Sequence, residues 1–292
     1  MSKPSIAIIG PGKVGTALGI LAARAGYTIA GIGARNLEKA QAAAAAVGRG
    51  VRIGRPEQIA PAGGLVLLTV SDDAIEPVCK QLAQAKAFAR GAVVAHCCGA
   101  ISSDVLSAAR DRCGAAVGSM HPLQTFPSVE AGLEKFAGTY CFCEGDAPAV
   151  EMLETFSADL GGKPVRIGSS GKLLYHASAV MACNYFTALI DAALATAELA
   201  HVDRADALAA LEPLVRATLD NVFAVGPAKA LTGPIARGDV GLVERQYQAI
   251  KAADAQLGEI YRLLGLQAVD VALRKGTIDP QRADELRRLL RS

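Results

Sequence analysis

Lys172 and His176 stand four positions apart in the segment KLLYHASAVMACN. Side chains at positions i and i+4 of a helix lie on the same face, so both could act on one substrate. When a hydride reduces a carbonyl, negative charge develops on the oxygen, and a lysine or histidine can stabilise or protonate it. The spacing favours hydride-transfer chemistry, with Lys172 as general acid and His176 orienting the substrate.

The long helix that Lys172 opens has few other polar residues. Projected at about 100° per residue, its polar side chains fall within a sector of about 120°. This polar stripe contains Lys172, His176, Asn184, Thr187, Asp191 and Glu198. The rest of the helix is mostly apolar, so we expect burial on several sides. The stripe faces either water or a cleft; we favour a cleft for its first turns, with Asn184 as a further substrate ligand.

Two loops carry further candidates. His121 lies in SMHPLQTFP, where prolines stiffen the chain. It either holds this loop by hydrogen bonds or contacts the nicotinamide or substrate. Arg237 and Asp239 lie in the Gly/Pro loop LTGPIARGD. Arg237 could bind a substrate carboxylate, but pairing with Asp239 or a subunit contact is an equal alternative.

A dinucleotide site is indicated by GPGKVG, which follows the apolar run IAIIG and opens a helix. Gly10 permits a tight turn, Gly12 lets backbone amides approach a pyrophosphate, and Gly15 allows the helix to pack closely on the strand. The helix N-terminus adds partial positive charge. We therefore predict cofactor contacts from Gly10 to Gly15, including Lys13 and Val14.

The phosphorylated cofactor, NADP(H), is favoured by the residues that end the second strand. An NAD enzyme places an acidic side chain there, where it holds the ribose hydroxyls. This chain has Arg35 and Asn36, and no acid before Glu38. A guanidinium can clamp the extra phosphate with two charge-assisted hydrogen bonds, whereas a carboxylate would repel it.

Further cofactor contacts are expected where the next apolar run, LVLLTV, ends. Val70, Ser71 and Asp72 follow this strand, and His96 to Gly99 end the one after it. Doubly wound folds place ligands at this carboxyl edge of the sheet. Ser71 or Asp72 could also cap the following helix, which is compatible with a cofactor contact.

The alternation of apolar runs and alanine-rich helical stretches predicts an α/β fold, a doubly wound parallel Rossmann sheet. Later strands are expected at 65–70, 92–98, 115–121 and 139–145. After Gly168 only helices are expected, at 172–200, 203–224, 240–264, 266–275 and from 280. The predicted domains are a cofactor domain, 1–168, and an all-helical domain for substrate binding and dimerisation, 169–292.

The amino-acid composition limits the classes of binding partner that we expect. Thirty basic residues balance 28 acidic ones among 292, so nothing points to nucleic acid or an anionic membrane. We expect a cytoplasmic protein, because no run has the organisation of a signal peptide or a membrane span. The seven cysteines form no paired metal-ligand spacing, and no metal is expected.

In combination, these motifs resemble a known family. GPGKVG, HCCG, HPLQTF, KLLYHASAVMACN and LTGPIARGD occur in this order over most of the chain. The same order is typical of Rossmann-like proteins whose helical half is the domain of unknown function 2520, similar to the 6-phosphogluconate dehydrogenase group. Members are usually labelled NADP oxidoreductases, and some are alternative ketopantoate reductases.

The resemblance implies an NADPH-dependent reductase of a small 2-oxo acid, with ketopantoate as the leading candidate, and a homodimer formed through the helical domain. In ordinary ketopantoate reductases a lysine opens this helix, followed four residues later by a substrate ligand that is usually asparagine. Here Lys172 and His176 hold those places, and Cys98 stands where many relatives have serine. Two alternatives stay open: an imine reductase similar to pyrroline-carboxylate reductases, and a non-catalytic NADP(H)-binding or sensing protein.

Overall fold

The computed structural model describes residues 3–291, which divide into two compact units between Ala182 and Cys183. We had placed the boundary between residues 168 and 169. The units divide later because the first turn of helix α8 (Lys172–Ala179) packs with the preceding sheet, where the Lys172 side chain is buried. The division therefore falls inside a long helical stretch and not in the linker before it.

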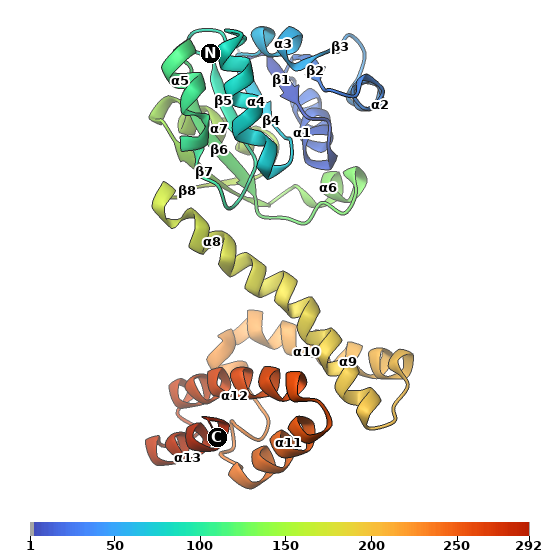
Figure 1. Ribbon diagram of the computed structural model, residues 1–292, viewed down its shortest axis with the longest axis vertical. Helices are drawn as coiled ribbons and strands as arrows, with labels where there is room; N and C mark the ends of the chain where they lie inside the picture. The colour runs from blue at the N-terminus through green and yellow to red at the C-terminus, as the bar shows by residue number, and fades with distance from the viewer. Residues whose placement is uncertain (1–2, 292) are drawn as a thin grey trace. The chain divides into compact units, whose positions relative to one another are not determined.

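The first unit is an α/β fold built on one eight-stranded sheet with the order β3-β2-β1-β4-β5-β6-β7-β8 (Figure 1). The strands are β1 (Ile6–Ile9), β2 (Ile29–Gly33), β3 (Arg52–Gly54), β4 (Leu65–Leu68), β5 (Val93–His96), β6 (Ala116–Pro122), β7 (Tyr140–Gly145) and β8 (Lys163–Arg166). The doubly wound Rossmann sheet is confirmed. The expectation of an all-parallel sheet is wrong at one place, because β7 runs antiparallel to β6.

Helices cover both faces of this sheet. The α-helices are α1 (Lys13–Arg24), α2 (Leu37–Val47), α3 (Pro56–Ile59), α4 (Asp72–Gln84), α5 (Ser107–Cys113), α6 (Val129–Lys135), α7 (Ala147–Asp159) and α8. Alternate residues of β1 point into two separate cores, Ile6 and Ile8 into one, Ala7 and Ile9 into the other. Helices α1, α2 and α7 close the first core, and α4 and α5 close the second (Figure 1). This two-sided burial explains the continuous apolar strands.

The parallel strands end at one edge of the sheet. Ile9 pairs with Leu68, Leu68 with His96, and His96 with Ser119. The loops after β1, β4 and β5 therefore leave the sheet side by side, and His121 lies two residues beyond the last of these pairs. A glycine turn, Ser71, the HCCG segment and His121 are thus brought to the same edge, although up to about a hundred residues separate them in the sequence.

The second unit is helical. Its elements are α9 (Tyr185–Leu199), α10 (Arg204–Ala230), α11 (Val240–Ala253), α12 (Ala255–Lys275) and α13 (Pro280–Arg291). The expected break near residue 265 lies instead at Asp254, whose carboxylate accepts a hydrogen bond from the Leu257 amide and so begins a new helix. Helix α10 extends beyond the expected residue 224, with an interruption at Gly226, whose φ is 80°.

Apolar side chains of α9 and α10 remain exposed within one chain. Phe223 is 85% exposed, and Leu214 and Tyr185 are each more than 60% exposed. The stretch Ser169–Leu199 is long and apolar enough to cross a membrane, and only 6% of its apolar window is buried. Our expectation that this helix is buried on several sides is therefore not met within residues 3–291, where α10 packs on part of α9 and Leu194 is the one buried residue of α9.

Candidate active site

The cofactor-binding half of the site is a pocket of about 620 Å³ at the carboxyl edge of the sheet. It is lined by the glycine loop after β1, the end of β2, the start of α3, the residues after β4 and the first turns of α4. This volume lies in the range of small-molecule and cofactor pockets. Six predicted cofactor residues line it: Gly10, Gly12, Arg35, Asn36, Val70 and Ser71.

The glycine loop leaves room where a phosphate needs it. Gly10 has φ of +100°, and a Cβ there would lie 2.7 Å from Val70. A Cβ on Gly15 would lie 2.3 Å from the Thr69 hydroxyl, so only glycine lets α1 approach this closely. Gly12 is different, because a Cβ there would meet nothing closer than 3.8 Å. It is the N-cap of α1, without a side-chain cap or an acidic first turn. Its own amide donates to the Gly10 carbonyl, and the first amide bonded within the helix is that of Thr16, so the amides of Lys13, Val14 and Gly15 can face an anion.

Three cations line the pocket where the adenosine half of a dinucleotide binds in this fold. Arg35 follows β2, Lys39 lies in the first turn of α2, and Arg55 follows β3. All three are exposed. Among the hydrogen bonds and ion pairs of residues 3–291, none engages these three charged groups. Sequence reasoning missed Lys39, although its i+4 spacing from Arg35 is a signal, and it missed Arg55 because it did not predict β3.

Four predicted cofactor residues do not line this pocket: Lys13, Val14, Gly15 and Asp72. Gly15 faces Thr69 and Gly10 in the packing between helix and strand. Lys13 and Val14 form the first turn of α1. Asp72 begins α4 behind the N-cap residue Ser71. Ser71 is in the cap position that the sequence suggested, but its side chain makes no capping hydrogen bond, which leaves the hydroxyl at the pocket wall.

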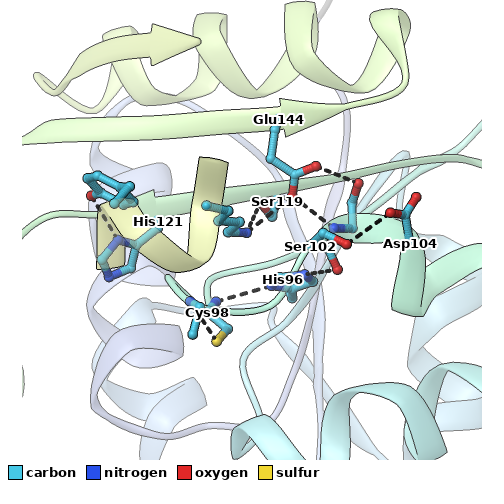
Figure 2. A network of polar contacts seen from close by, with 11 residues as sticks. His96, Cys98, Ser102, Asp104, Ser119, His121 and Glu144 are labelled. Atoms are coloured by element: carbon cyan, nitrogen blue, oxygen red, sulfur yellow. Dashed lines mark hydrogen bonds and ion pairs between the residues drawn. The ribbon is translucent and has the colours of Figure 1, made fainter. Parts of the chain in front are cut away.

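Lys172 is held in a closed polar network, not on a pocket wall. Its side chain is 1% exposed and that of Glu144 is 2% exposed, and the Lys172 Nζ lies 3.1 Å from the Glu144 Oε1. The ammonium also donates to the Ser119 hydroxyl. Ser119 in turn donates to Glu144 over 2.6 Å. Ser103 donates to the same carboxylate from its amide and its hydroxyl, at 2.8 and 2.9 Å. Figure 2 shows Glu144 and Ser119 facing each other across this network.

The network keeps Lys172 and Glu144 charged inside the protein. Burial lowers the pKa of Lys172, and the negative charge of Glu144 opposes that shift. Burial alone would raise the pKa of Glu144, but the hydrogen bond from Ser119 and the charge of Lys172 hold it below its usual range. The network joins β6, β7, α8 and the short helix η2 (Ser103–Leu106). It therefore fixes the start of α8 on the sheet.

A cluster of imidazoles lies next to this network. His121 at the end of β6 and His176 in α8 have ring centroids 5.7 Å apart. Gly99 lies against both: a Cβ there would be 2.4 Å from the His176 ring and 2.8 Å from the His121 ring. The structure thus brings together His121 and His176, two candidates that the sequence offered separately, and adds Tyr175, whose hydroxyl is 3.1 Å from the His121 Nδ1. Figure 2 shows His121 near the HCCG segment.

His96 and Cys98 complete this part of the edge. The Cys98 amide donates to the His96 Nδ1 over 3.1 Å, so the ring proton is on Nε2 and points to the Ser102 carbonyl (Figure 2). Burial lowers the pKa of His96 to about 4, and the charge of Lys172 adds to this. Burial and a hydrogen bond to Asp72 raise the pKa of the Cys98 thiol. Both groups are therefore uncharged at neutral pH.

Asn184 does not continue the polar stripe as projected. Residues Val180–Asn184 form a π-helical turn, η4, which adds one residue to the helix and changes the phase of everything after it. Asn184 also belongs to the second unit.

In the second unit, Asp239 caps α11 by accepting a hydrogen bond from the Leu242 amide at 3.1 Å. The carboxylate of Asp239 therefore has a role that does not involve Arg237. Residues 3–291 contain no group of three or more potential metal ligands.

Two family models match the chain. The Rossmann-like domain matches residues 1–122, and the domain of unknown function DUF2520 matches residues 139–268. The chain is a Rossmann-like protein with a DUF2520 domain. No curated protein matches it.

Solved structures share the fold of this Rossmann-like DUF2520 protein. The suggested NADP oxidoreductase BF3122 from Bacteroides fragilis is 21% identical, with a TM-score of 0.70 over 93% of this chain and 99% of that one. Protein TM1727 from Thermotoga maritima is 24% identical, with a TM-score of 0.69 and the same coverage. An imine reductase from Pseudomonas sp. is 19% identical, with a TM-score of 0.63 over 97% and 98% of the two chains. At these identities the likeness concerns the fold.

Proposed function

We propose that this protein is an NADP(H)-dependent oxidoreductase that reduces a small substrate. The observation that carries the proposal is the pocket with Arg35, Lys39 and Arg55 at the position where an NAD-binding protein needs a carboxylate. The amides in the first turn of α1, from Lys13 to Gly15, would hold the pyrophosphate, and the three cations would hold the 2′-phosphate. NADPH supplies a hydride when bound. The solved structures of similar fold include a reductive aminase in complex with NADPH.

The imidazole cluster is the part of the described edge that suits the substrate. His121 and His176 present ring nitrogens beside Gly99, and a hydrogen bond to the reacting oxygen or nitrogen would stabilise the charge that develops there. Lys172 carries out a different task in this proposal. Its ammonium is already bound by Glu144 and Ser119, so it holds α8 in place and is not the immediate proton donor.

A small 2-oxo acid, with ketopantoate first, remains our leading substrate class. Arg237 is exposed and its neighbour Asp239 is used as a helix cap, so the guanidinium is available for a carboxylate. The closed network of Lys172 gives specific support to a second candidate, a cyclic or open imine. Such a substrate needs less from a protonating lysine.

Comparing NADPH and NADH affinities tests the cofactor assignment. Titration followed by nucleotide fluorescence should show tighter binding of NADPH in the wild type. Arg35→Ala should weaken NADPH by roughly tenfold or more, because it removes a bidentate charge-assisted contact, and should leave NADH almost unchanged. Arg49→Ala, an exposed arginine outside the pocket lining, is the control. Tighter binding of NADH by the wild type contradicts the assignment.

Turnover separates an enzyme from a binding protein. NADPH oxidation would be followed with ketopantoate, other 2-oxo acids and 1-pyrroline-5-carboxylate. Reduction of an oxo acid supports the leading substrate class, and reduction of the pyrroline alone supports the imine alternative. Tight NADPH binding with no reduction of any member supports a sensing protein instead.

We also propose that the protein is a cytoplasmic homodimer formed through its helical unit. The exposed apolar residues of α9 and α10, among them Tyr185, Leu214 and Phe223, require a cover that a second copy supplies. A cytoplasm keeps seven free cysteines reduced. Light scattering should give twice the chain mass, and the double variant Leu214→Ser, Phe223→Ser should give the monomer mass. Flotation with lipid vesicles in place of a dimer would identify a membrane as the cover.

A further inference from the structure

Tyr175 and His121 form a pair between the first turns of α8 and the end of β6. The Tyr175 hydroxyl lies 3.1 Å from the His121 Nδ1, and the two rings meet edge to face with centroids 5.9 Å apart. The Tyr175 ring also packs on Phe142, at a centroid distance of 4.1 Å. Phe142 opposes His121 in the β6–β7 ladder. The phenol is thus fixed against the same strand pair that carries the imidazole.

Both members of the pair are uncharged at neutral pH. Burial raises the pKa of Tyr175 above its usual value. Burial lowers the pKa of His121 to about 4, electrostatic repulsion from His176 and Lys172 adds to this, and the carboxylate of Asp72 opposes it. The phenol therefore keeps its O–H proton, and the neutral imidazole has one N–H proton, on either Nδ1 or Nε2. If the phenol donates to Nδ1, the ring proton must be on Nε2; if Nδ1 donates to the phenol, the ring proton is on Nδ1.

The surroundings of Nδ1 favour donation from the phenol. A Cβ on Gly99 would lie 2.9 Å from Nδ1, so the backbone of Gly99 closes that side of the ring to water. For residues 3–291 the Tyr175 hydroxyl has one hydrogen-bond partner, Nδ1 itself. If Nδ1 carried the proton, the hydrogen of the part-buried phenol would lack an acceptor in the protein, which is unfavourable.

We propose that Tyr175 is a positioning residue that donates to the His121 Nδ1 and thereby keeps the proton of the neutral ring on Nε2. The imidazole then presents an N–H donor at Nε2, the ring nitrogen that Tyr175 does not engage, to the oxygen or nitrogen that gains charge when hydride arrives. A neutral donor suits this place because the neighbouring ammonium of Lys172 is already neutralised by Glu144. This role rests on the proposed reductase function, whereas the tautomer itself does not.

The tautomer can be measured without substrate. The sequence contains four histidines, so ¹⁵N-labelled side chains give few resonances, and loss of one set in His121→Gln assigns them. In the wild type at neutral pH, His121 should show a protonated Nε2 and a bare Nδ1. Tyr175→Phe removes the donor and should give a mixture of both tautomers. Tyr140→Phe removes an exposed phenol elsewhere and should change nothing. A protonated Nδ1 in the wild type, or an unchanged spectrum in Tyr175→Phe, overturns the proposal.

Kinetics provide the second readout. With whichever oxo acid or imine the protein reduces, Tyr175→Phe should lower kcat by about ten- to a hundredfold. This is less than the loss of roughly 10²–10⁴ expected for the donor itself, because Tyr175 acts through His121. The KM for NADPH should stay the same, because the pair lies outside the lining of the cofactor pocket. An unchanged kcat overturns the catalytic part of the proposal. Absence of turnover in the wild type is a failure of the reductase function, and the NMR result then still decides the tautomer.

Discussion

The positive charges of the first unit occur in two very different settings. Arg35, Lys39 and Arg55 are exposed around an open pocket and lack an ion-pair partner among residues 3–291. Lys172 is 1% exposed and has a carboxylate and a hydroxyl as partners. Free charges at a pocket wall gain energy only when an anionic ligand arrives, whereas a buried pair is satisfied before any ligand is present. The first setting therefore indicates binding, and the second indicates positioning.

The largest difference between the two settings should appear in stability. Lys172→Met leaves Glu144 buried without its partner, and removal of one member of a buried pair typically costs about 3–5 kcal/mol. The free energy of unfolding from urea titration measures this. The matched control is Lys80→Met, which breaks an exposed Lys80–Glu76 pair of 2.6 Å and should cost less than about 1 kcal/mol. Equal losses in the two variants would remove the distinction.

Acid should lower the free energy of unfolding through the buried histidines His96 and His121, and the exposed cations of the cofactor pocket should contribute far less to this loss. His96 and His121 have folded-state pKa values of about 4, below the unfolded value of about 6.5. Between these values the unfolded chain binds more protons, so stability is complete above pH 6.5 and falls as the pH decreases to 4. The loss is about 3 kcal/mol for each histidine at most. His121→Gln should flatten this slope in urea titrations, whereas substitution of the exposed His201 by Gln should not.

The smallest effect should come from one free cation. Arg55→Ala should weaken NADPH by a few-fold, because Arg55 is one of three charges around the phosphate and is exposed to salt. Its free energy of unfolding should stay within about 0.5 kcal/mol of the wild type, as for other surface substitutions. Binding curves at low and high salt check the first point, and a weaker salt dependence is expected in the variant. A large stability loss would show that Arg55 resembles Lys172 after all.

Most residues of the cofactor pocket could be predicted from the sequence, because they follow motifs of short, fixed spacing. Gly10, Gly12 and Gly15 follow a strand at fixed spacing, and Arg35 ends the next strand. Arg55 escaped prediction because β3 has only three residues, two of them exposed, which gives no apolar alternation. The closed network could not be foreseen, since Glu144 and Ser119 contact Lys172 from two other strands and Ser103 joins through Glu144 from a third element.

The position of Asn184 shows a second limit. A projection at about 100° per residue assumes an uninterrupted α-helix. The turn Val180–Asn184 has π geometry, and no pattern in VMACN indicates it. Residues before this turn, Lys172 and His176, lie in the uninterrupted α-helix α8, while the phase of those after it could not be predicted. The order of the helices, by contrast, follows local rules and was mostly predicted.

Gly99 links the HCCG segment to two distant parts of the chain. Because a single added carbon would collide with the rings of both His121 and His176, the residue at 99 depends on what stands at 121 and 176. Among relatives, we expect the three positions to covary: chains with smaller side chains at 121 and 176 can accept alanine or serine at 99. An alignment deep enough to count such triplets would then distinguish proteins that use this pair of imidazoles from those with another chemistry.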